Sequence, residues 1–104
     1  MNEIIWLPTA QKHLDLIYQW LAERSEAAAL KLVNDILKET DRLARFPEIG
    51  QIERSLENYP NKFRAVVVRR NFKIIYFVES QTIYISAIWD CRKEPRTIHE
   101  IFKT

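Results

Sequence analysis

The sequence has little of what metal sites and many catalytic sites need. Its 104 residues include one cysteine, two histidines and one glycine. The single cysteine, Cys91, excludes an internal disulfide, and the two histidines leave too few soft ligands for a structural zinc site. The sequence contains no run of about 18 apolar residues that would predict a membrane span. Its first residues lack the basic start and apolar centre of a secretion signal. We therefore expect no metal, no cofactor, no membrane association and a cytoplasmic location.

The composition indicates an ordered globular protein, because 47% of the residues are hydrophobic and 12% are aromatic. A chain of this length predicts one domain, over residues 1–104. Its charge is unevenly divided, although the net charge is only +2. Residues 62–104 hold nine Lys or Arg against four Asp or Glu, a net charge of +5, whereas residues 1–61 carry −3. This asymmetry predicts an acidic or polyanionic partner for the second half.

A short strand and two helices are predicted in the first half. Residues 3–7 are β-branched and aromatic, and Pro8 cannot continue a strand. Thr9 is suited to cap a helix whose apolar residues recur at helical spacing, namely Leu14, Ile17, Tyr18 and Leu21. Ser25 is suited to cap a second helix, which Pro47 and Gly50 end. The short link between the two helices predicts an antiparallel hairpin.

Strands dominate the second half. Alternating apolar residues predict strands over residues 63–68, 72–78 and 82–89, with a weaker strand near 51–53. The short connections predict hairpins, and Asn71 is suited to a positive φ. Glu94-Pro95 predicts the start of a short last helix. The fold class is therefore α+β, with a short N-terminal strand, an antiparallel helical hairpin packed on a mainly antiparallel sheet of four or five strands, and a short C-terminal helix.

Several short segments, in this order, resemble a known family. They are Thr9-Ala10 with Asp15-Leu16-Ile17-Tyr18, Leu43-Ala44-Arg45-Phe46-Pro47-Glu48-Ile49-Gly50, Phe63-Arg64, Phe72-Lys73-Ile74-Ile75-Tyr76, and Ile88-Trp89-Asp90-Cys91-Arg92-Lys93-Glu94-Pro95. The whole chain resembles the RelE/ParE superfamily of toxins from bacterial type II toxin–antitoxin systems. The resemblance implies growth inhibition by one of two routes, since the RelE branch cleaves messenger RNA on the ribosome and the ParE branch inhibits DNA gyrase.

The residues bear on the choice between these branches. By resemblance, Arg64, Lys73 and Arg92 occupy positions of basic catalytic or phosphate-binding groups in a metal-independent endoribonuclease. Lys73 stands where the ribonuclease motif usually has arginine, and lysine lacks the fork that grips phosphate in a bidentate manner. The expected C-terminal histidine or tyrosine is also missing, and His99 is the nearest candidate. We therefore favour the ParE-like branch and keep the RelE-like ribonuclease as the alternative.

In either branch the basic strands form the candidate binding surface for a target or an antitoxin. Its predicted members are Arg64, Arg69, Arg70, Lys73, Trp89, Arg92 and Lys93. The competing interpretation is a solvated sheet face or a charged edge that discourages aggregation. The resemblance implies a cognate antitoxin whose acidic segment wraps the toxin, in a possible hetero-oligomer, and DNA gyrase or ribosome-bound mRNA as the target.

Overall fold

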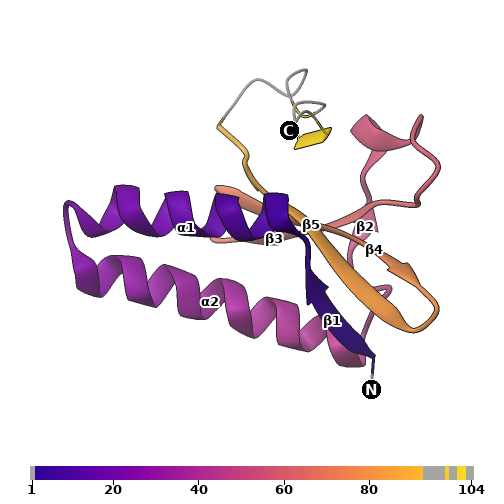
Figure 1. Cartoon of the computed structure of the whole chain (residues 1–104), viewed down its shortest axis with the longest axis horizontal. Helices are drawn as coiled ribbons and strands as arrows, with labels where there is room; N and C mark the ends of the chain where they lie inside the picture. The colour runs from indigo at the N-terminus through magenta and orange to yellow at the C-terminus, as the bar shows by residue number, and fades with distance from the viewer. Residues whose placement is uncertain (1, 93–97, 99–100, 103–104) are drawn as a thin grey trace.

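The computed structural model describes residues 2–92, 98 and 101–102. Strand β1 (Glu3–Trp6) is followed by helices α1 (Pro8–Ala22) and α2 (Glu26–Arg45). The chain continues with β2 (Gln51–Ile52), the 3₁₀ helix η1 (Arg54–Leu56), β3 (Arg64–Val68), β4 (Phe72–Glu79) and β5 (Thr82–Asp90). This order confirms the α+β class (Figure 1). The expected C-terminal helix falls mostly on residues outside the described part.

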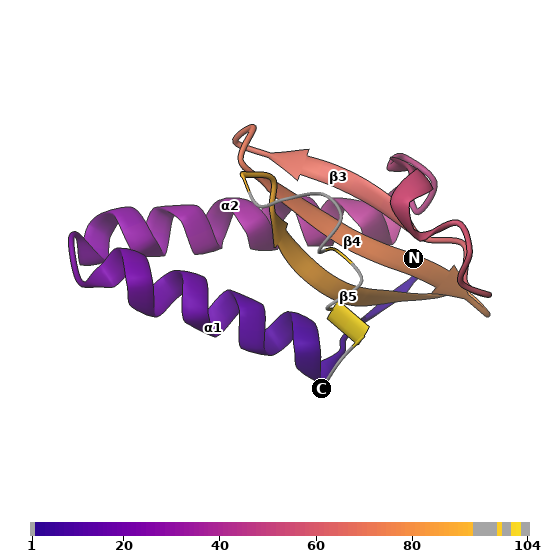
Figure 2. The same ribbon diagram turned by 90° about the horizontal axis from the view of Figure 1, so that it is seen from above.

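The two helices form the predicted antiparallel hairpin, and the turn between them lies beyond the sheet (Figures 1 and 2). The Ser25 cap is confirmed, because its hydroxyl accepts a hydrogen bond from the Ala28 N–H at 3.1 Å. The predicted Thr9 cap is wrong, since α1 begins at Pro8 and Leu7 takes the N-cap position without a side-chain bond. Proline suits the first helical position, because its fixed φ is already helical and it has no N–H to satisfy.

The five strands form one sheet in the order β1-β5-β4-β3-β2. β1 runs parallel to β5, and all other neighbours are antiparallel. β1 pairs with Thr82–Ile85, the first part of β5. Beyond it, the imidazole Nδ1 of His13 in α1 accepts a hydrogen bond from the Ile88 N–H at 3.2 Å. A side chain of α1 therefore satisfies part of the strand edge that β1 leaves open.

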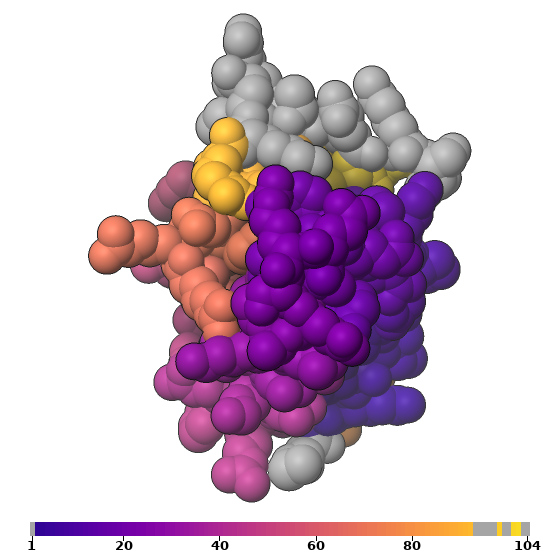
Figure 3. Space-filling model, turned by 90° about the vertical axis from the view of Figure 1, so that its left-hand side faces the viewer, coloured from indigo at the N-terminus to yellow at the C-terminus, as the bar shows by residue number. Residues whose placement is uncertain are grey.

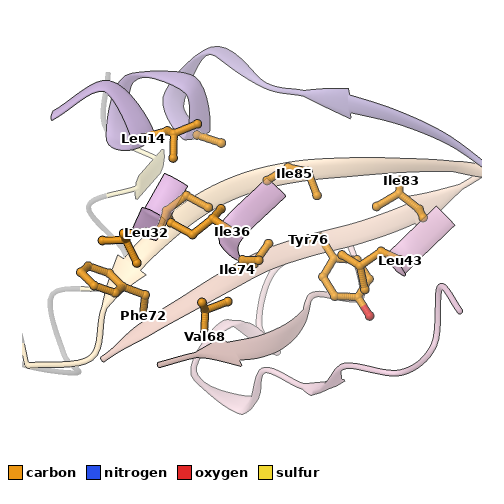
Figure 4. Packing of buried hydrophobic residues seen from close by; sticks show 12 residues of the cluster. Leu14, Leu32, Ile36, Leu43, Val68, Phe72, Ile74, Tyr76, Ile83 and Ile85 are labelled. Carbon is orange, nitrogen blue, oxygen red and sulfur yellow. The ribbon is translucent and has the colours of Figure 1, made fainter. Parts of the chain in front are cut away.

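Apolar residues cover both faces of the sheet. The cluster on the helix side joins α1 and α2 to the strands (Figure 4), and its buried members include Leu14, Leu32, Ile36, Leu43, Val68, Phe72, Ile74, Tyr76, Ile83 and Ile85. The cluster on the opposite face consists of Leu56, Phe63, Ile75, Ala87, Trp89, Ile98 and Ile101. The alternation along β4 therefore sends successive side chains into two separate cores.

Two hairpin turns contain residues with positive φ. In the β3–β4 turn these are Arg69 at 52° and Arg70 at 65°, so the prediction for Asn71 is wrong. The carbonyl of Asn71 accepts a hydrogen bond from the Cys91 N–H at 2.7 Å and thereby continues the β4–β5 pairing. The β4–β5 turn has two central residues, Ser80 and Gln81, at 51° and 63°. Positive φ at both positions is typical of a type I′ turn.

Candidate functional site

Arg64 lies at the start of β3, directly opposite Tyr76 of β4. Residues directly opposite in an antiparallel pair share a face, so Arg64 is on the helix side. Its Nη1 donates to the carbonyl of Gly50 at 2.7 Å and to that of Glu48 at 3.3 Å. Arg64 therefore braces the loop between α2 and β2.

Lys73 lies opposite Trp89 and shares the face of the second cluster. Its Nζ is 2.8 Å from the carboxylate of Glu53, whose side chain is only 7% exposed. Arg64 and Lys73 thus point to opposite faces of the sheet, and each is already bonded within the chain. Glu53 is not among the predicted site residues, because its loop position in the sequence favours a solvated carboxylate. That interpretation is wrong, since Glu53 is buried and folds back onto β4.

Arg69 and Arg70 lie in the β3–β4 turn, which projects beside the helices (Figure 3). Arg69 pairs with Asp35 of α2, with 2.6 Å between Nη2 and the carboxylate. Arg70 is exposed, and within the described part of the chain it has no ion-pair partner. The turn thus has one cation that fastens it to α2 and one that faces solvent. Lys93 lies outside the described residues.

Arg92 follows β5 and forms a bidentate salt bridge with Asp90. Its Nε and Nη2 donate to the two carboxylate oxygens, each at 2.9 Å. This bond raises the pKa of the Arg92 guanidinium above its ordinary value. Trp89 is 7% exposed and belongs to the second core cluster, so little of its indole can contact a partner. Burial also raises the pKa of the Cys91 thiol, against the opposing effect of Lys73. A raised pKa leaves little thiolate at neutral pH, as in an ordinary cysteine.

The structure therefore separates the predicted basic residues into three places. Arg64 lies at one end of β3, about 13 Å along the strand from its other end at Val68. Arg69 lies just past that other end. Arg92 lies near the same end, because its guanidinium is 5.8 Å from the ring of Phe72, which pairs with Val68. Lys73 lies on the other face. Among the described residues, these cations therefore do not share a single surface.

A buried hydroxyl organises the loop that Arg64 braces. The Tyr76 hydroxyl accepts a hydrogen bond from the Gly50 N–H at 2.9 Å and donates one to the carbonyl of Pro47 at 2.8 Å. Figure 4 shows Tyr76 beside Leu43, with the hydroxyl at the edge of the core cluster. Burial raises the pKa of Tyr76, although the Gly50 bond opposes the shift. The hydroxyl therefore keeps the proton that it donates to Pro47.

The described residues include no group of three His, Cys, Asp or Glu side chains placed to hold a metal ion. Within the same part of the chain, no helix combines the length and apolar character needed to cross a bilayer.

Comparisons with known proteins agree with this fold. Residues 4–95 match the family described as the ParE toxin of the type II toxin–antitoxin system parDE. The chain belongs to the ParE toxin family. A solved structure titled as a chromosomal ParDE TA system from P. aeruginosa is similar, with a TM-score of 0.69 and 25% identity over 86% of this chain and 96% of that one. A search of curated proteins gave no match.

Membership of the ParE family confirms the predicted resemblance and makes the chain a type II toxin by family. The segment Phe46-Pro47-Glu48-Ile49-Gly50 is part of that resemblance, but none of its residues is among the predicted site residues. In the structure, the segment is the loop held by Tyr76 and Arg64. The one available signal was Gly50, the only glycine in the sequence.

Proposed function

We propose that this ParE family toxin arrests growth by docking on an essential protein, DNA gyrase, and does not cut RNA. The observation that carries the proposal is the separation of Arg64, Lys73 and Arg92, each of which is bonded to another group of the same chain. Such residues stabilise the fold and shape its surface. A toxin that acts by binding a protein needs only such a surface and no catalytic groups.

Metal-independent RNA cleavage makes a stricter demand. The 2′-hydroxyl must lose a proton, cations must stabilise the phosphate in the transition state, and the leaving oxygen must gain a proton. All of these groups must meet at one phosphate. Arg64 and Lys73 lie on opposite faces of the sheet, so they cannot both reach it. Loss of one preorganised donor typically costs on the order of 10²–10³ in rate, which makes the remaining set a poor catalyst.

The second part of the proposal is a cognate antitoxin that neutralises the toxin in a cytoplasmic complex. Support comes from the family and from the net charge of +5 over residues 62–104, which an acidic segment would complement. We expect a toxin–antitoxin hetero-oligomer. Co-expression with the product of an adjacent gene should restore growth and give a stable complex on size exclusion.

The decisive experiment compares the two possible targets directly. Purified toxin should inhibit supercoiling by DNA gyrase, while transcripts in a translation reaction stay intact. Unaffected gyrase at a stoichiometric excess of toxin would contradict the proposal. Arg92→Ala separates the alternatives further, because a ribonuclease that uses Arg92 as a phosphate clamp would lose most of its cleavage. Transcripts cut by the wild type but not by this variant would replace docking with RNA cleavage.

A further inference from the structure

A hollow of about 610 Å³ lies where the loop after α2 meets β3 and β4. It is lined by Arg45, Phe46, Pro47, Glu48, Ile49, Lys62, Arg64 and Val78. This volume is in the range of sites that hold small ligands or anchoring side chains. The hollow does not include Arg69, Arg70, Lys73 or Arg92, so it is distinct from the other basic positions.

Three apolar side chains around the hollow remain open to solvent. Phe46 is 55% exposed, Ile49 is 40% exposed and Val78 is 39% exposed. Single exposed apolar residues are normal, whereas a group of them around one concave surface marks a contact site. An aromatic side chain beside two aliphatic ones fits an apolar anchor from a partner.

The charges around the hollow favour an acidic partner. The charged residues that line it are three cations, Arg45, Lys62 and Arg64, and one carboxylate, Glu48. Arg64 is held by carbonyl groups, while Arg45 and Lys62 are exposed and have no salt-bridge partner in the described part of the chain. The partner's carboxylates would supply the missing counter-charges.

The hollow is also preformed. Tyr76 fixes the loop at Pro47 and Gly50, and Arg64 binds the carbonyls of Glu48 and Gly50. The loop therefore loses little conformational entropy when a partner binds, which is the main advantage of a preorganised site.

We propose that this hollow docks an acidic peptide segment of a protein partner, one that inserts a bulky apolar side chain between Phe46, Ile49 and Val78. The inference rests on the proposed function, since it names the surface through which a docking toxin meets a partner. A peptide fits better than a nucleic acid. Nucleic-acid grooves stack bases on aromatic rings, whereas two of these three apolar side chains are aliphatic, and Arg64 already donates to backbone carbonyls.

The test measures binding of a fluorescein-labelled dodecapeptide, three repeats of Asp-Leu-Glu-Phe, to the purified toxin by fluorescence anisotropy. Lys62→Glu and Phe46→Ser should each weaken binding by about tenfold or more, since they remove a counter-charge and an apolar anchor. Arg70→Glu and Leu30→Ser are matched controls, because both residues are exposed and neither lines the hollow. Both controls should bind as the wild type does.

Two further measurements keep the result independent of the folding of any variant. In wild-type toxin, the peptide should shift the amide NMR signals of Ile49, Gly50 and Val78. Replacing the acids of the peptide with amides, or its apolar residues with serine, should abolish these shifts. Absence of binding, or equal losses in the matched controls, would overturn the proposal. Preferential binding of a single-stranded RNA dodecamer at the same amides would overturn it in favour of a nucleic acid.

The outcomes also distinguish this inference from the gyrase proposal. Inhibition of gyrase without peptide binding would remove the hollow as a docking site and leave the target intact. Peptide binding at the hollow without gyrase inhibition would support the docking site and reject that target.

Discussion

Replacing Gly50 with alanine tests whether the loop after α2 depends on the close approach of Tyr76. An added Cβ would lie 2.6 Å from the Tyr76 hydroxyl oxygen, 2.8 Å from its Cε1 and 2.9 Å from the carbonyl oxygen of Ala65. The φ of Gly50 is not positive, so space and not backbone conformation requires the glycine. Two of these three contacts are with a ring in a packed core, which cannot move freely.

The expected cost follows from three contributions. Overpacking of a core costs about 1–3 kcal/mol. Displacing Tyr76 weakens its bonds with Gly50 and Pro47, each worth about 1 kcal/mol. Alanine returns about 0.4–1 kcal/mol by restricting the unfolded chain. The net loss is therefore about 2–4 kcal/mol in the free energy of unfolding, a fall in Tm on the order of 10 °C.

The assay is urea unfolding followed by tryptophan fluorescence, for Gly50→Ala, Tyr76→Phe and the double variant. Phenylalanine removes the atom closest to the new Cβ, so Gly50→Ala should cost at least about 1 kcal/mol less in the Tyr76→Phe background. Equal costs in the two backgrounds would refute the reasoning, because they would mean that the hydroxyl does not limit the space at Gly50. So would a Gly50→Ala variant as stable as the wild type.

Further predictions concern the caps, turns and titrating groups. Ser25→Ala should lower the free energy of unfolding by about 1 kcal/mol, measured by urea unfolding, because the Ala28 N–H loses its acceptor. Gln81→Gly should raise Tm, since glycine adopts the φ of 63° without strain. Above pH 10.0, the ordinary pKa of tyrosine, the unfolded chain loses its proton before folded Tyr76, so stability should fall as pH rises, less so in Tyr76→Phe. Cys91 should react with iodoacetamide more slowly in the folded protein than in urea, because its pKa is raised.

Local patterns explain most of the elements that were predicted correctly. The Ser25 cap, the helical spacing in α1 and the alternation in β4 all depend on residues close together in sequence. The parallel pairing of β1 with β5 could not be predicted from such local patterns. Pairing of Ile4 with Ile83 joins the first strand to the fifth, and nothing near either residue specifies its partner.

The candidate site was harder to predict for a related reason. The positions of Arg64 and Lys73 in the sequence reveal their charge but not the groups that they meet. Only the fold brings Glu53 to Lys73, and the Gly50 carbonyl to Arg64. Strand alternation does place the two cations on opposite faces, given the register of β3 with β4. That register depends on the assembled sheet, so the separation became evident only with the structure.

The position of β1 has a consequence for synthesis of the protein on the ribosome. β1 is made before the other strands, yet its strand partner is the first half of β5, the last of the five strands in chain order (Figure 1). Until residues 82–85 leave the exit tunnel, β1 cannot pair, and α1 lacks the Ile88 N–H that meets His13. Stalled nascent chains that end before residue 82 should therefore be cleaved by protease much faster than the released protein. A toxin of this family built in this way completes its sheet only after β5 has left the exit tunnel.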